Sequence, residues 1–141
     1  MAAHSEGLST IASGAYSHTE GQSVTATGAA SHAEGDTTAA NGSATHAEGS
    51  NTIADGDYSH AEGTWTYATG DYSHTEGIAT TTNGKAAHAE GGNLNSSGNT
   101  LANITTSDDT EISGSQADGI CSHAEGVQTY AKGYSSHAEG Y

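Results

Sequence analysis

Small residues alternate with polar ones along most of the chain, and the alternation recurs every 14 residues. Each of the nine histidines is followed by Glu at the second position and by Gly at the third, as in His60-Ala61-Glu62-Gly63. If each histidine is position 0 of its unit, Ser, Ala and Thr recur at −1, +1, +6 and +8, and a second Gly recurs at +10. An alternation with a period of two residues is typical of a β-strand whose two faces have different surroundings.

The repeat predicts an all-β fold. Each half of the unit contains a run of the form Ser/Thr-x-Ala-x-Gly, and we predict a strand of about five residues ending at each Gly, where a positive φ turns the corner. Gly at every seventh residue disfavours a helix by about 1 kcal/mol each. The sequence therefore predicts a parallel β-solenoid with 14 residues and two short strands per coil. Small residues face inward, while His, Glu and positions +7 and +9 face outward.

One spacing departs from the repeat. His88 and His123 are 35 residues apart, which is five half-units, so we expect the register to slip by half a coil there. The predicted organisation is β-roll repeats over 1–98, an irregular insertion over 99–116, and repeats resumed over 117–141. The insertion is expected to be a loop or short hairpin leaving the rod, or a pair of irregular half-coils.

Composition restricts the core and the partners. Leu, Ile, Val and Phe account for only 11 of 141 residues, so any core is thin and built from small side chains. The net charge of −15 argues against a nucleic-acid partner, because phosphates would be repelled. No apolar stretch approaches the roughly 20 residues of a membrane span, and no export signal is recognisable within the chain, so no membrane insertion is expected.

The repeated His and Glu form the candidate chemistry. On one strand face they build two parallel columns, for which three hypotheses stay open: a hydrogen-bonded ladder, a divalent-metal site, or a pH-responsive interface. A metal is possible but no cofactor is required. The candidate ligands are His18, Glu20, His32, Glu34, His46, Glu48, His60, Glu62, His74 and Glu76.

Catalysis is not expected. Neighbouring Ser and His on one strand, such as Ser59 and His60, point to opposite faces, so they cannot form a nucleophile and base pair. A motif present nine times is also typical of a scaffold, since catalysis needs one preorganised pocket. Aromatic residues at outward positions are instead predicted to bind a ligand or pack against another chain. These are Tyr58, Trp65, Tyr67, Tyr72 and Tyr130.

The runs Ser31-His32-Ala33-Glu34-Gly35 and Ser122-His123-Ala124-Glu125-Gly126 resemble the YadA-like head repeats of trimeric autotransporter adhesins, which also have 14-residue units. The His/Glu form is similar to repeats in phage tail and surface fibre proteins. The resemblance implies a left-handed β-roll, a trimeric adhesive rod, a host-surface or matrix ligand, and a location outside the cell, on the cell surface or on a virion. The alternative is an extracellular filament whose subunits stack end to end.

Overall fold

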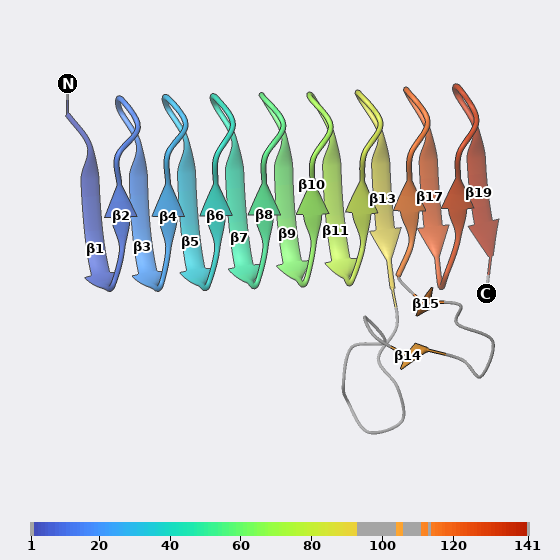
Figure 1. The fold of residues 1–141 in the computed structure, drawn as a ribbon, viewed down its shortest axis with the longest axis horizontal. Coiled ribbons are helices and arrows are strands. Elements are labelled where there is room, and N and C mark those ends of the chain that lie inside the picture. The colour runs from blue at the N-terminus through green and yellow to red at the C-terminus, as the bar shows by residue number, and fades with distance from the viewer. Residues whose placement is uncertain (1, 93–103, 106–110, 113, 141) are drawn as a thin grey trace.

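The chain forms a parallel β-solenoid in which two sheets run along a rod (Figure 1). The structure is a computed structural model that describes residues 2–92, 104–105, 111–112 and 114–140. These residues form strands and turns but no helix, so they contain no helix able to cross a membrane. The predicted fold class is confirmed in its architecture and in its 14-residue spacing.

The first sheet has nine strands, each starting at a repeat histidine. It consists of β1 (His4–Leu8), β3 (His18–Gln22), β5 (His32–Asp36), β7 (His46–Ser50), β9 (His60–Thr64), β11 (His74–Ile78), β13 (His88–Gly91), β17 (His123–Gly126) and β19 (His137–Gly140). The second sheet has eight shorter strands. It consists of β2 (Ile11–Ala12), β4 (Thr25–Ala26), β6 (Ala39–Ala40), β8 (Ile53–Ala54), β10 (Tyr67–Ala68), β12 (Thr81–Thr82), β16 (Gln116–Ala117) and β18 (Tyr130–Ala131).

Every strand of these two sheets pairs in parallel with its copy on the next coil. His46 lies opposite His60, Glu48 opposite Glu62, and the same register holds from β1 to β19. The turns are also hydrogen-bonded from coil to coil, since the Tyr58 amide donates to the Ser43 carbonyl at 2.9 Å. Each coil is therefore hydrogen-bonded to the next through its strands and its corners. Residues at the same repeat position lie above one another along the rod.

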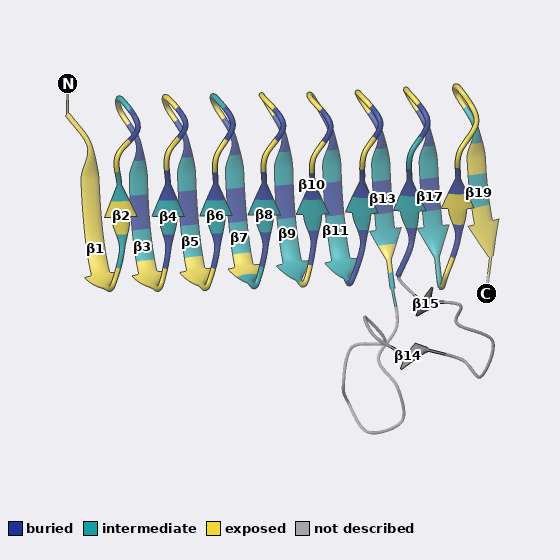
Figure 2. Cartoon of the chain, viewed as in Figure 1, coloured by how far each residue is buried: buried dark blue, intermediate teal, exposed yellow. Residues whose placement is uncertain are grey.

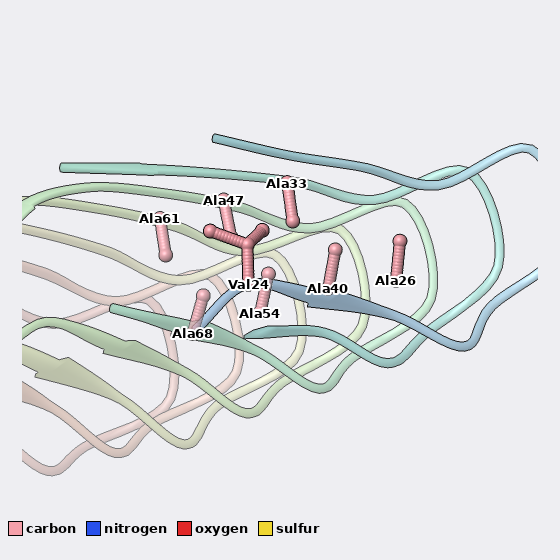
Figure 3. Close-up of a cluster of buried hydrophobic side chains, with 8 residues drawn as sticks. All are labelled: Val24, Ala26, Ala33, Ala40, Ala47, Ala54, Ala61 and Ala68. Carbon is pink, nitrogen blue, oxygen red and sulfur yellow. The ribbon is translucent and has the colours of Figure 1, made fainter. Parts of the chain in front are cut away.

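The core lies between the two sheets and is made of small side chains, as predicted. Positions −1, +1, +6 and +8 are buried in the middle coils, and Val24 is the largest fully buried residue (Figure 2). Figure 3 shows the alanines at +1 and +8 facing each other across this narrow interior. Ser at −1 also closes the corner, because Ser31 Oγ donates to the Gly28 carbonyl at 2.7 Å.

The corners differ from the prediction. Most long strands run one residue beyond the Gly at +3, although β13, β17 and β19 end at that Gly as predicted, and the short strands span only +7 and +8. The left-handed φ values fall mostly on non-Gly residues at +5 and +12, including Thr37 and Trp65, both at 59°. Such residues are disfavoured there by about 1–2 kcal/mol each, and the coil-to-coil hydrogen bonds hold them in place.

Gly is required mainly because the coils approach closely. A Cβ placed on Gly56 at +10 would overlap the carbonyl oxygen of Gly70, the same position one coil on. None of the described Gly residues at +10 has a positive φ, so the close backbone approach explains the residue there. At +3, both a positive φ and the close approach of the next coil require Gly. Gly63 has φ 109°, and a Cβ there would also overlap the Gly77 carbonyl.

The break in the repeat does not shift the sheets by half a coil, and residues 93–113 are called the inserted segment. β13 pairs directly with β17, with His88 opposite His123, and β12 pairs with β16. The rod has resumed by Ser115, whose carbonyl accepts from the Thr81 amide at 2.9 Å. Within the predicted insertion, β14 (Ile104–Thr105) and β15 (Glu111–Ile112) pair antiparallel, in agreement with a hairpin. The other residues of the insertion before residue 114 lie outside the described residues, as does Gly98.

Replacing Gly56 by Ala should strongly destabilise the rod, because the added methyl group would force two coils apart. We expect the free energy of unfolding to fall by about 3 kcal/mol or more, measured as a loss of thermal stability by circular dichroism. Gly133 is the matched control, since it occupies the same repeat position in the last coil and its Cβ would meet nothing closer than Ser136 Cβ at 3.4 Å. Equal losses in the two variants would contradict this account of the glycines.

Removing residues 93–113 and joining Gly92 to Gly114 should leave the rod folded, because His88 and His123 would then be 14 residues apart as in the other coils. We expect a parental melting temperature by circular dichroism. Removing 91–111 deletes the same number of residues but places Ile112 where Gly91 lies against the Gly126 backbone, so that variant should be less stable. Unfolding of the first variant would show that the segment supports the architecture.

Candidate functional site: the His/Glu columns

The nine histidines form a continuous stack along the outer face of the nine-stranded sheet. Successive rings lie 4.8–4.9 Å apart between centroids and are nearly parallel, with interplanar angles of 1–11°. The stack continues from one side of the inserted segment to the other, because His88 stacks on His123 at 4.8 Å. The spacing equals the separation of neighbouring strands, so the backbone register places every ring.

The glutamates form a second column beside the rings. His46 Nε2 lies 3.8 Å from Glu48 Oε2 of its own coil, and His74 Nε2 lies 3.7 Å from Glu62 Oε1 of the preceding coil. His88 Nε2 contacts both neighbours, at 3.3 Å from Glu76 and 3.9 Å from Glu90. A ring nitrogen of His46, His60, His74 and His88 thus lies between two carboxylates that are one coil apart.

Most of these nitrogens are buried but lack a hydrogen-bond partner. Within the described residues, the Nε2 atoms of six histidines have almost no exposed surface and no partner within hydrogen-bonding geometry. The group comprises His18, His32, His46, His60, His74 and His123. A buried polar atom without a partner is destabilising by about 1–3 kcal/mol, so the arrangement favours anything that would satisfy these nitrogens.

The carboxylates line an open groove on the same face. Its volume is about 530 Å³, and Gly residues at +3 accompany the Glu column along its length. The lining residues are Glu20, Glu34, Gly35, Glu48, Gly49, Glu62, Gly63, Glu76 and Gly77. Because Gly has no side chain, the carboxylates stand beside bare backbone and are open to solvent and ions.

Burial and neighbouring groups shift the pKa values of several side chains in the columns. Burial, followed by the charges of His74 and His46, lowers the pKa of His60 below its usual value. Burial and the neighbouring His46 likewise lower the pKa of His32. In the Glu column, a hydrogen bond between the Glu76 and Glu90 carboxyl groups raises the pKa of Glu90 and lowers that of Glu76.

The structure brings most of the candidate ligands into sets of three. Within each set one ligand atom per residue lies within 4.8 Å of the others, and among the described residues the sets are Glu34-His46-Glu48, Glu48-His60-Glu62, Glu62-His74-Glu76, His88-Glu90-His123 and His123-Glu125-His137. The candidates His18, Glu20 and His32 stand in the same columns but belong to none of these sets. His88, Glu90, His123, Glu125 and His137 were not among the predicted ligands, although the same His-x-Glu-Gly motif identifies them.

The predicted aromatic residues do not form one patch. Tyr58 and Tyr72 stack at 5.1 Å at the corner between the short and the following long strand. Trp65 occupies the opposite corner, between the long strand β9 and the short strand β10. Tyr67 and Tyr130 lie in β10 and β18 on the eight-stranded sheet, and Lys132 Nζ lies 5.5 Å from the centre of the Tyr130 ring.

Comparison with protein-family models and with curated proteins found no match to this chain.

The lowered pKa of His60 predicts that mild acid destabilises the rod. Because the unfolded chain binds the proton more tightly than folded His60, stabilisation present above about pH 6.5 is lost as the pH falls through the folded pKa. We expect the melting temperature to fall between about pH 7.5 and 5.5, above the range in which Glu titrates.

The effect should depend on the half-buried His60 ring. His60→Gln should reduce the fall in melting temperature, whereas His4→Gln should not, because the His4 side chain is 67% exposed at the first coil. A rise in melting temperature on acidification, or the same fall in both variants, would contradict the assignment.

Proposed function

We propose that this chain is a structural rod module of a bacterial surface adhesin or phage tail fibre, located outside the cell, on the cell surface or on a virion. The supporting observation is the unbroken in-register stack of nine long strands, which makes the outer surface nearly uniform along the rod. Such a surface can space two attachment points or present one contact many times. The resemblance of the His-x-Glu-Gly runs to adhesin head repeats supports the same role.

The geometry of the columns supports a structural role over an enzymatic one. The same His and Glu recur on successive coils at 4.8–4.9 Å, with carboxylates along an open groove. Catalysis needs one preorganised pocket from which water is excluded. A repeated, solvent-accessible array is better suited to binding or to assembly.

We further propose that the rod is a homo-oligomer, with three left-handed chains side by side as the resemblance implies. Apart from Val24, the fully buried side chains are Ala, Thr and Ser. These supply little apolar burial, while each ordered residue loses about 1.5 kcal/mol of conformational free energy. Contact with further chains would bury more apolar surface, and the flat outer face of the eight-stranded sheet carries Ile53, Tyr67 and Tyr130 for that purpose.

End-to-end stacking into a filament is the second candidate. β1 and β19 are the two edge strands of the nine-stranded sheet and carry the same His-x-Glu-Gly sequence. β19 of one copy could therefore continue the parallel register onto β1 of another, as an open strand edge allows.

Sedimentation equilibrium together with electron microscopy tests the proposal. We expect short rods with three times the mass of one chain; long unbranched filaments would favour the second candidate. Tyr67→Ser with Tyr130→Ser should shift the mass toward one chain, while the matched corner pair Tyr58→Ser with Tyr72→Ser should not. A stable monomer of the parent chain would overturn the oligomer proposal.

A further inference from the structure

We propose that the His/Glu columns bind a row of zinc ions, each held between one imidazole and two carboxylates from successive coils. The central site consists of His46 Nε2 with the carboxylates of Glu34 and Glu48, and the same arrangement recurs one coil later around His60 and again around His74. Near the C-terminal end the ligand set changes to two imidazoles and one carboxylate, from His88, Glu90 and His123.

The distances fit a metal ion better than a hydrogen bond. His46 Nε2 and Glu48 Oε2 are 3.8 Å apart, and His74 Nε2 and Glu62 Oε1 are 3.7 Å apart. A hydrogen bond would require about 2.7–3.2 Å between these atoms. Two ligands of a tetrahedral zinc ion, each about 2.0–2.1 Å from the metal, lie about 3.4 Å apart, so small side-chain movements suffice to close the site.

The buried nitrogens supply independent support. His46, His60 and His74 each have an Nε2 atom that is buried and without a hydrogen-bond partner. These are the atoms that point between successive carboxylates, so an ion placed there would satisfy the nitrogen and neutralise the carboxylates together. A group on a neighbouring chain could not reach these atoms without displacing the side chains around them.

The ligand chemistry selects the class of metal. One imidazole and two carboxylates leave a fourth tetrahedral position for water, which suits zinc. Calcium and magnesium prefer sites made only of oxygen ligands, so they should depend little on the histidines. Zinc binding should also weaken as the pH falls, because a ligating Nε2 must be deprotonated.

Shared ligands limit how many ions the column holds. Glu48 belongs to the sets around His46 and His60, and Glu62 to those around His60 and His74. Ions on adjacent coils would also repel each other strongly at this spacing. Among the described sets, three can be filled without sharing a residue: those around His46 and His74, and one of the two that contain His123.

Zinc binding goes beyond the rod proposal and does not depend on it. A rod without zinc sites would leave the proposed function intact, and a zinc-binding chain that is monomeric would overturn the oligomer alone. The two proposals are therefore tested by separate measurements.

Calorimetric titration of the full chain with zinc chloride, after removal of metal by chelation, tests the inference. We expect the parent to bind about three ions per chain and to bind magnesium at least tenfold more weakly. His46→Gln with His60→Gln and His74→Gln removes the three central nitrogens and leaves the set with His123, so the stoichiometry should fall to one. His4→Gln with His18→Gln and His32→Gln is the matched control and should retain three.

A measurement on the parent alone guards against a variant that fails to fold. Zinc should shift the nitrogen-15 resonances of Nε2 in both His46 and His74 and leave those of His4 unchanged. Absence of saturable zinc binding, equal stoichiometry in the two triple variants while both remain folded, or magnesium binding as tight as zinc binding would overturn the proposal.

Discussion

Parallel hydrogen bonding between identical residues of successive coils determines nearly every other feature of this molecule. Because each strand pairs in register with its copy, backbones meet at the interstrand spacing of about 4.8 Å throughout the rod. At +10 that approach excludes even a Cβ, which explains Gly56 without any appeal to its φ. Between the sheets it leaves room for Ala, Ser and Thr, so a chain with few large apolar residues still forms a continuous core.

The same register determines which polar side chains become neighbours, and these neighbours differ between the two sheets. Next to the eight-stranded sheet, position +9 carries a mixture of hydroxyl, amide, carboxyl and Lys side chains, so Asn41 donates to Asp55 at 2.8 Å and Asn83 donates to Asp118. On the nine-stranded sheet, position +2 is Glu in every unit, so no amide separates the carboxylates. Neighbouring carboxylates repel by about 0.9 kcal/mol in water, and the imidazole column is the only regular partner that the sequence places beside them.

Periodicity in the sequence was sufficient to predict the coil, its inward positions and the two columns, because each of these follows from which residues repeat. It could not place the corners, since Thr37 and Trp65 adopt a left-handed φ that neither residue favours. The pairing of β13 with β17 was also missed, because 35 residues fit a half-coil slip as well as a whole-coil insertion. Hydrogen bonding between coils favours the whole-coil insertion over the half-coil slip, because it keeps the His88 ring stacked on the His123 ring.

A column of identical ionisable groups cannot titrate as independent sites. The charges of His74 and His46 both oppose protonation of His60, and the shared hydrogen bond moves the pKa values of Glu76 and Glu90 in opposite directions. A positive charge on one coil therefore disfavours another on the next coil more strongly than one further along, where the repulsion has weakened. Protons and metal ions are subject to the same rule, so strict repetition of the sequence leads to uneven occupancy of the columns.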